Sequence, residues 1–190
     1  MTAAPSGRAR RAPAARREAV LDAARTLFIE QGVGATTMAQ IADRAGVAKG
    51  TVYLYFASKD AMLGCLEAEF ESDIVRRTRA WCDGHTEIAD AVPAWCAGLV
   101  HAYLATRPVH DMLFLGRTPT TRAAVADNGL IDDLHTLLAD AGRPHPADVA
   151  AFLVGGITVM VDRALLHDDH PDQQRLADTA RRLASAVLDH

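Results

Sequence analysis

The segment from Thr36 to Lys59 constrains the fold of this 190-residue chain more tightly than any other stretch. Thr37 is a favourable residue before the first turn of a helix. Gln40, three positions later, completes a Thr-x-x-Gln capping box, in which each side chain satisfies a backbone amide of the other residue. We therefore predict that a helix begins at Met38. Gly46, which tolerates a left-handed backbone, ends this helix and lets the chain turn sharply.

A second short helix is predicted from Ala48 to Tyr55, and its spacing places Val52 and Phe56 on the buried side. The outward side combines a cation, hydroxyl groups and a residue without a side chain, which together can approach the base edges and phosphates of DNA. Two helices joined by such a tight turn form a helix-turn-helix motif. The outward residues are Lys49, Gly50, Thr51 and Tyr53.

A further helix is predicted to start after Ser58, which is a good N-cap residue. This start places the ammonium group of Lys59 beside the positive end of a helix, where a phosphate would sit. One feature of the preceding helix is less favourable, because Ala48 stands where a serine or threonine cap would add roughly 1 kcal/mol of local stability.

The run GVGATTMAQIADRAGVAKGTVYLYFASKDAML resembles the DNA-binding domain of TetR-type (TetR/AcrR-like) transcriptional repressors. The resemblance covers about a quarter of the chain, and it depends on the turn glycine, the small-Thr-hydrophobic-Tyr sequence and the aromatic-x-x-Lys ending. It implies phosphate contacts by Thr37, Tyr53, Tyr55 and Lys59. It also implies a base-facing surface made of the four outward residues. The expected DNA-binding residues are therefore Thr37, Gln40, Lys49, Gly50, Thr51, Tyr53, Tyr55 and Lys59.

Charge is distributed unevenly along the chain. Residues 1–60 contain nine Lys or Arg against five Asp or Glu, whereas residues 61–190 contain eleven against nineteen. A basic head on an acidic body suits a protein that offers one end to nucleic acid. The only two lysines, Lys49 and Lys59, both lie in the predicted motif.

We predict an all-α fold, because no stretch of alternating β-branched residues appears and the apolar residues recur at helical spacing. Residues 1–13 are expected to be a disordered basic arm, residues 14–60 the helix-turn-helix domain, and residues 61–190 a ligand-binding and dimerisation domain. The arm is either a solubilising tail or a source of additional phosphate and minor-groove contacts. Its arginine cluster consists of Arg8, Arg10, Arg11, Arg16 and Arg17.

Nine helices are expected in all, as the resemblance also implies. The first runs from about Ala14 to Gln31, with Val20, Ala24, Leu27 and Phe28 buried. Proline-containing segments separate the later helices. Those after the motif are expected at about 60–82, 87–106 (broken or kinked near Pro93), 109–117, 121–141, 147–167 and 172–188.

The most apolar run, AAFLVGGITVMV, covers residues 150–161. It is too short to span a bilayer, which needs about 20 residues, and an all-round apolar helix is expected to be buried on every side. In TetR-like proteins the last two helices of each subunit pair across a two-fold axis, so the resemblance implies a homodimer. The alternative is that these residues only fill the core of the monomer. The predicted interface residues are Phe152, Gly155, Gly156, Val159, Leu183 and Val187.

Large apolar or amphipathic residues in the middle helices are candidates to line a cavity for an apolar effector, although core filling is the common role of such residues. The existence of an effector is implied by the resemblance. The candidate ligand-binding residues are Trp95, Leu99, Tyr103, Met112, Phe114 and Met160. Polar residues that could orient a ligand are His101, His110 and Asp111.

Other site chemistries are less well supported. The His167–His170 segment has metal-ligating residue types, but it lies before Pro171, where a solvated helix end is expected. Three cysteines without metal-ligand spacing favour reduced thiols in a cytoplasmic protein, and a redox role for Cys82 near Arg79 is the alternative. No signal peptide or membrane span is evident in the pattern.

The sequence contains no phosphate-binding glycine loop or nucleophile elbow, so we expect neither an enzyme nor a cofactor. The favoured interpretation is a cytoplasmic, homodimeric one-component repressor. It would bind double-stranded DNA at a palindromic operator and be released by an unidentified small molecule. A constitutive or architectural DNA-binding protein is the alternative, and an enzyme that happens to carry the motif is a more distant one.

Overall fold

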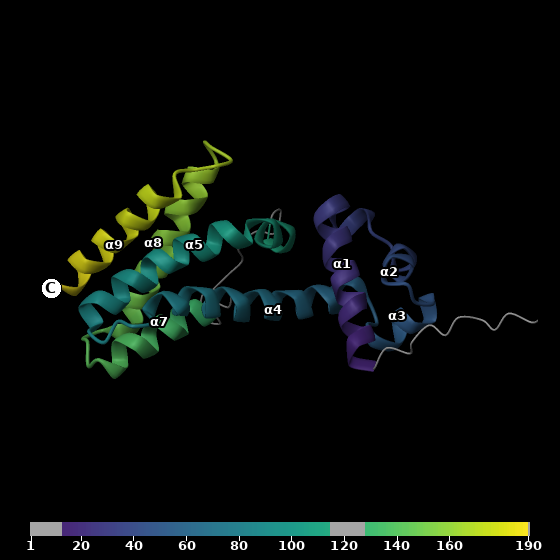
Figure 1. The fold of residues 1–190 in the computed structure, drawn as a ribbon, viewed down its shortest axis with the longest axis horizontal. Coiled ribbons are helices and arrows are strands. Elements are labelled where there is room, and N and C mark those ends of the chain that lie inside the picture. The colour runs from purple at the N-terminus through teal and green to yellow at the C-terminus, as the bar shows by residue number, and fades with distance from the viewer. Residues whose placement is uncertain (1–12, 115–127, 190) are drawn as a thin grey trace, which may run out of the picture. The chain divides into compact units, whose positions relative to one another are not determined.

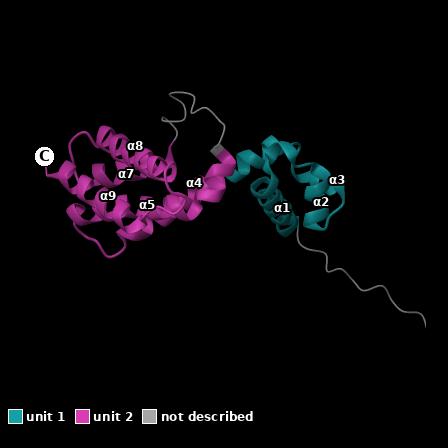
Figure 2. Ribbon diagram, turned by 90° about the horizontal axis from the view of Figure 1, so that it is seen from above, with its two compact units in different colours: residues 1–66 teal, residues 67–190 magenta. Residues whose placement is uncertain are grey.

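The computed structural model describes residues 13–114 and 128–189, with the backbone alone described for Phe114. Within these ranges every regular element is a helix and no strand occurs, which confirms the predicted all-α class. The chain divides into two compact units, Met1–Leu66 and Glu67–His190 (Figure 2). Each unit has its own hydrophobic core, so we describe the two separately.

Three helices that pack on one another form the first unit (Figure 1). The predicted buried face of the first helix is confirmed, because Val20, Ala24, Leu27 and Phe28 are at most 8% exposed. Regular helix geometry is interrupted at Gly32, where φ is 82°, close to the predicted end of this helix. The helices are α1 (Pro13–Ala35), α2 (Met38–Ala45) and α3 (Lys49–Tyr55), followed by α4 (Lys59–Arg79), which contains the boundary between the units.

The second unit is built around α5 (Ile88–Phe114), which packs against α9, α8, α7 and the short 3₁₀ helix η1 (Figure 1). All residues from 91 to 100 are buried. By length and composition, residues 88–113 could also cross a membrane, but 67% of their most apolar window is buried, as expected for a core helix. The remaining elements are η1 (Ala80–Cys82), α7 (Gly129–Asp140), α8 (Pro146–Leu165) and α9 (Gln173–Leu188).

The predicted break between residues 106 and 109 is wrong, because α5 continues through both Pro93 and Pro108. A proline inside a helix removes one backbone hydrogen bond. Residues on both sides of Pro108 make side-chain contacts. The hydroxyl of Tyr103 lies 2.9 Å from Nε2 of His110, and Arg107 binds both Asp111 and Asp169.

The next helix begins later than predicted. An N-terminus at residue 121 lies outside the described residues, but α7 starts at Gly129, because Asn128 has an extended backbone and caps the helix. The side-chain oxygen of Asn128 accepts hydrogen bonds from the amides of Leu130 and Ile131, at 3.1 and 3.4 Å. An asparagine that bonds the following backbone favours a helix start over helix continuation.

The apolar run in α8 is not buried on every side, contrary to prediction. Leu153, Val154 and Ile157 are buried, but Phe152 and Val159 are 68% and 65% exposed. Neighbouring helices cover one side of α8, and the apolar side chains on the other side face outward.

Trp81 fixes η1 against the centre of the second unit. Its ring stacks on His101 with a centroid separation of 4.3 Å, and the guanidinium of Arg181 lies 5.7 Å from the ring centroid. Gly98 leaves room for this ring, because an added Cβ would lie 2.7 Å from Trp81 Cγ and 2.8 Å from the carbonyl oxygen of Thr78.

We predict that Gly98→Ala lowers the free energy of unfolding by about 1–3 kcal/mol, since a methyl group there overpacks a well-filled core. Thermal unfolding followed by circular dichroism would measure the effect. The matched control is Gly64→Ala in α4, where an added Cβ meets nothing within 4 Å. This control should preserve or raise stability, because alanine is the better helix former. Equal effects of the two substitutions would contradict the assigned role of Gly98.

Candidate nucleic-acid interface

The predicted capping box at the start of α2 is present. The backbone amide of Thr37 donates to Gln40 Oε1 at 2.8 Å, and the amide of Gln40 donates to Thr37 Oγ1 at 3.3 Å. At the other end, Gly46 adopts the left-handed conformation (φ 67°), and its amide donates to the carbonyls of Ala42 and Asp43. Both ends of this short helix are therefore fixed locally, which sets the direction in which the chain enters α3.

The outer face of α3 is exposed and carries no acidic residue. Val52 and Phe56 are buried, as predicted, while Lys49 and Gly50 are exposed and Tyr53 is 49% exposed. Thr51 and Tyr55 are half-buried beside them. Ala48 provides no side-chain cap, as the sequence predicts. The first turn of α3 thus keeps backbone amides that no capping side chain engages.

Lys59 has an internal role that the sequence did not reveal. Its Nζ donates to the carbonyl oxygens of Val33 and Thr36, at 2.6 and 2.8 Å. The lysine therefore binds the segment that joins α1 to α2 from the first residue of α4. A cation in the first turn of a helix is unfavourable toward the helix dipole. This unfavourable position was the available signal that another partner holds the side chain.

Thr36 strengthens the same connection and was also missed. It is 1% exposed, and its hydroxyl donates to the carbonyl of Gly32 at 2.8 Å. The side-chain amide of Gln31 donates back to this hydroxyl at 3.2 Å. The buried polar groups of the connection thus have partners, so the connection is defined rather than loose.

Arg17, a member of the predicted arginine cluster, is exposed and contacts the surface of the first unit. Its guanidinium carbon lies 4.9 Å from the centroid of Phe56, and its Nη2 lies 3.2 Å from Cys65 Sγ. This arginine supports the frame behind α3. The cluster members Arg8, Arg10 and Arg11 lie outside the described residues.

Among the residues proposed for ligand binding, Trp95, Leu99 and Tyr103 are buried in the second unit. Trp95 Nε1 donates to Asp133 at 2.8 Å, and the Tyr103 hydroxyl donates to Asp162 at 2.6 Å. Burial and then this bond raise the pKa of Tyr103, so the phenol stays protonated. Met112 and Met160 are half-buried, and the side chain of Phe114 lies outside the described part.

The polar candidates lie beside these residues. His110 sits between Tyr103 and Asp111, with Nδ1 3.4 Å from the Asp111 carboxylate. The side-chain amide of Gln173 forms a hydrogen bond with Nδ1 of His101. Burial and, to a smaller extent, the charge of Arg181 lower the pKa of His101.

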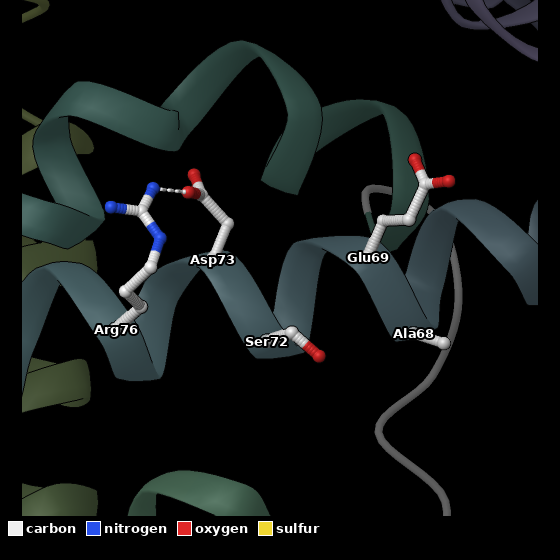
Figure 3. Close-up of a pocket in the computed structure, with 5 residues that line it drawn as sticks. All are labelled: Ala68, Glu69, Ser72, Asp73 and Arg76. Atoms are coloured by element: carbon white, nitrogen blue, oxygen red, sulfur yellow. Dashed lines mark hydrogen bonds and ion pairs between the residues drawn. The ribbon is translucent and has the colours of Figure 1, made fainter. Parts of the chain in front are cut away.

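Figure 3 shows an open hollow along α4, and its lining includes none of the proposed ligand-binding residues. All of its lining side chains come from one helix. Burial raises the pKa of Asp73, but hydrogen bonds from Arg77 and Arg76 outweigh it and leave that pKa lowered. The hollow is therefore a surface depression next to an ion-paired carboxylate. It is lined by Ala68, Glu69, Ser72, Asp73 and Arg76.

Two alternative chemistries receive no support from the geometry. Burial and, to a smaller extent, the charge of Asp133 raise the pKa of Cys82, although the charge of Arg79 opposes this effect. Burial raises the pKa of Cys96 to about 12. Arg79 is bound to Asp133 at 2.6 Å, so its charge is already paired. A reactive thiol needs a lowered pKa. Within residues 13–114 and 128–189, no group of three or more His, Cys, Asp or Glu residues could hold a metal ion.

Comparison with known proteins places the site in context. Residues 20–64 match the family model described as bacterial regulatory proteins, tetR family. The transcriptional repressor KstR2 of Rhodococcus jostii is 42% identical over 64 residues, 34% of this chain, and the match spans about a third (31%) of KstR2. The transcriptional activator FasR of Mycolicibacterium smegmatis is 28% identical over 185 residues, which are 92% of this chain and 84% of FasR.

A solved structure of SmeT in complex with triclosan has the same fold, with a TM-score of 0.68 and 22% sequence identity. The likeness covers 91% of each chain. At this identity it bears on the fold alone.

We predict that Lys59→Met destabilises the first unit by about 1–3 kcal/mol, because two carbonyl groups lose a charged donor. Urea unfolding followed by circular dichroism would measure the loss. Lys49→Met is the matched control, since Lys49 is the only other lysine and is exposed, and it should change stability by no more than about 0.5 kcal/mol. Equal stability of the two variants would show that the Lys59 bonds do not hold the connection.

Proposed function

Because the chain is a member of the TetR family of bacterial regulatory proteins, we propose that it is a homodimeric one-component repressor acting in the cytoplasm. It binds a palindromic operator in double-stranded DNA and is released by a small molecule bound in the second unit. The observation that carries this proposal is the exposed, acid-free outer face of α3. The residues around its neighbours in the chain, Thr36, Thr37, Gln40 and Lys59, form a frame whose polar groups are bonded internally. Such a face can enter a major groove without first breaking internal contacts.

DNA contacts are assigned to two sets of residues. Lys49, Gly50, Thr51 and Tyr53 face the base edges, and Thr37, Gln40, Tyr55 and Lys59 approach the phosphates together with Tyr53. The oxygens of Thr37 and Gln40 are already engaged with each other. These two residues therefore act at the start of α2 by presenting a capped helix N-terminus to a phosphate. Lys59 has three N–H donors, of which two bind carbonyls, so one is left for a phosphate.

Dimerisation is assigned to the exposed apolar surface of α8 and α9. Phe152 and Val159, seven positions apart and so on one face of α8, are 68% and 65% exposed, and Leu183 on α9 is 54% exposed. Exposed large apolar side chains that form one surface favour a protein partner, and we assign these three to such a surface. Gly155 and Gly156 are exposed, and nothing lies within 4 Å of a Cβ added to either, which lets a second helix approach closely. The half-buried Val187 completes the proposed interface.

An operator with two-fold symmetry follows from such a dimer. Two copies of α3 fit successive major grooves about 34 Å apart only when the dimer holds them at that spacing. A ligand that binds the second unit better in another geometry shifts the population away from the DNA-competent state, by no more than its differential affinity. The chain passes from one unit to the other inside α4, which gives this coupling a continuous helical connection.

An apolar effector is proposed for residues 61–190, because the large apolar and amphipathic side chains that could surround one lie in this part of the chain. The candidate contacts remain Trp95, Leu99, Tyr103, Met112, Phe114 and Met160. The direction of regulation is proposed as repression, as in the name of KstR2, whereas FasR is named an activator. The alternative, a ligand-independent architectural protein, predicts DNA binding without sequence preference.

The decisive experiment is selection of binding sites from random duplex DNA at moderate salt. We expect a palindrome for the wild type, and we expect Thr51→Ala and Tyr53→Phe to weaken operator binding by about 1–3 kcal/mol each, because each loses a hydroxyl donor. Size-exclusion chromatography should show an unchanged oligomeric state for both variants. Salt-sensitive binding without any sequence preference would favour the architectural alternative instead.

We predict that Leu183→Asp or Val159→Asp weakens the dimer by at least about 2 kcal/mol, roughly thirtyfold in the dissociation constant, because a carboxylate would be buried without a partner. Sedimentation equilibrium would measure the constant. The matched control is Leu166→Asp, which places the same charge at a leucine that is 83% exposed at the end of α8. If all three variants associate as tightly as the wild type, the dimer uses another surface.

A further inference from the structure

Leu54 is the most exposed large apolar residue of the first unit that the structure describes, at 78% exposure. Only two others in that unit, Tyr53 (49%) and Ile29 (42%), are exposed large apolar residues among those described. Two of the three are therefore neighbours on α3. A single exposed leucine is common on protein surfaces and needs no explanation by itself. Leu54, however, lies on the face that is proposed to bind DNA, so it would contact whatever binds there.

Helix geometry places Leu54 at the centre of the outer face. At about 100° per residue, Gly50 and Leu54 lie one turn apart along the same side of α3, roughly opposite the buried Val52. Thr51 and Tyr53 flank this side to the left and right. A helical side chain leans toward the preceding turn, so Leu54 leans over Gly50. Since Gly50 has no side chain and a Cβ added there would meet nothing within 4 Å, the leucine stands alone as the outermost group.

We propose that Leu54 reads a thymine in each operator half-site by packing against its C5-methyl group. This inference rests on the proposed function and adds a base identity to it. The thymine methyl is the apolar feature of the major-groove edge, and apolar side chains recognise it by contact. The polar groups of Lys49 and Thr51 cannot supply this recognition, and the half-buried Thr51 presents its methyl group less openly than Leu54, which is 78% exposed.

The chemistry of the surrounding surface favours DNA over a protein as the occupant. The seven residues of α3 include a lysine, a threonine and two tyrosines but no acid, so the leucine is surrounded by donors suited to phosphates and base edges. An apolar protein partner would be matched by a broader apolar patch, whereas Ile29 is on α1 and not on α3. On α3 the exposed apolar surface beside Leu54 is limited to the ring of Tyr53, which ends in a hydroxyl, so the apolar area is small enough to match one methyl group in a polar groove.

Replacement of thymine by deoxyuridine tests the proposal, because it removes only the methyl group. In the selected operator, deoxyuridine is placed at one thymine position at a time, symmetrically in both half-sites, and affinity is measured by fluorescence anisotropy. For the wild type we expect one position with a loss of about fourfold per half-site, about fifteenfold for both, which corresponds to one buried methyl group. For Leu54→Ala, the same substitution should have no effect.

The matched control is Ile29→Ala, which truncates an exposed apolar residue on α1 and should retain the full deoxyuridine penalty. Circular dichroism should show that each variant is folded, as expected for substitutions at exposed positions. A selected operator whose affinity is insensitive to deoxyuridine at every position, or equally sensitive in Leu54→Ala, would overturn the role of Leu54 and leave the proposed function intact. Failure to select any operator would overturn both.

Discussion

The two hydrogen bonds from Lys59 to the carbonyls of Val33 and Thr36 are the interaction on which the first unit depends. The connection between α1 and α2 is short, and Val33 lies in the last turn of α1, where its carbonyl also accepts the amide of Thr36 at 3.3 Å. A lysine at the first residue of α4 adds a charged donor to this carbonyl and to that of Thr36. One side chain thereby links the end of α1, the start of α2 and the start of α4. The orientation of α3, which lies between α2 and α4 in the chain, follows from these fixed points.

The contrast between this frame and the outer face of α3 has a physical reason. Thr37 and Gln40 bond each other, and the hydroxyl of Thr36 bonds Gly32 and Gln31, so the bonding capacity of these frame residues is largely used. Lys49 and Leu54 on α3 are left exposed, and Ala48 provides no cap. A surface that binds a polyanion gains most when its donors are not already committed, because no internal bond must be exchanged. The residues proposed to face the bases are thus separate from those that stabilise the segment, whereas Thr37, Gln40 and Lys59 are proposed to serve in both.

The features that sequence predicts well are those determined by neighbours in the chain. The Thr37–Gln40 capping box and the left-handed Gly46 need only residues within one or two turns, and both are present. Features that depend on distant residues were missed or wrong. The bonds of Lys59 reach carbonyls 23 and 26 positions away, and Arg107, next to Pro108 in the continuous α5, bonds Asp169, 62 positions later. Local propensity contains no information about such partners.

The α8 run shows why the second unit was harder to predict than the first. A helix that is apolar on every side has no hydrophobic period, so its sequence cannot distinguish burial within one chain from burial between two. In the structure, Leu153 and Ile157 pack inward while Phe152 and Val159 lie exposed, so a single chain buries only one side of this run. Leaving such side chains in water forgoes roughly 1.5–3 kcal/mol each relative to full burial. A second copy of the same surface would recover this energy, and a symmetric pair is also what a seven-residue α3 requires to read a site longer than one half-site can provide.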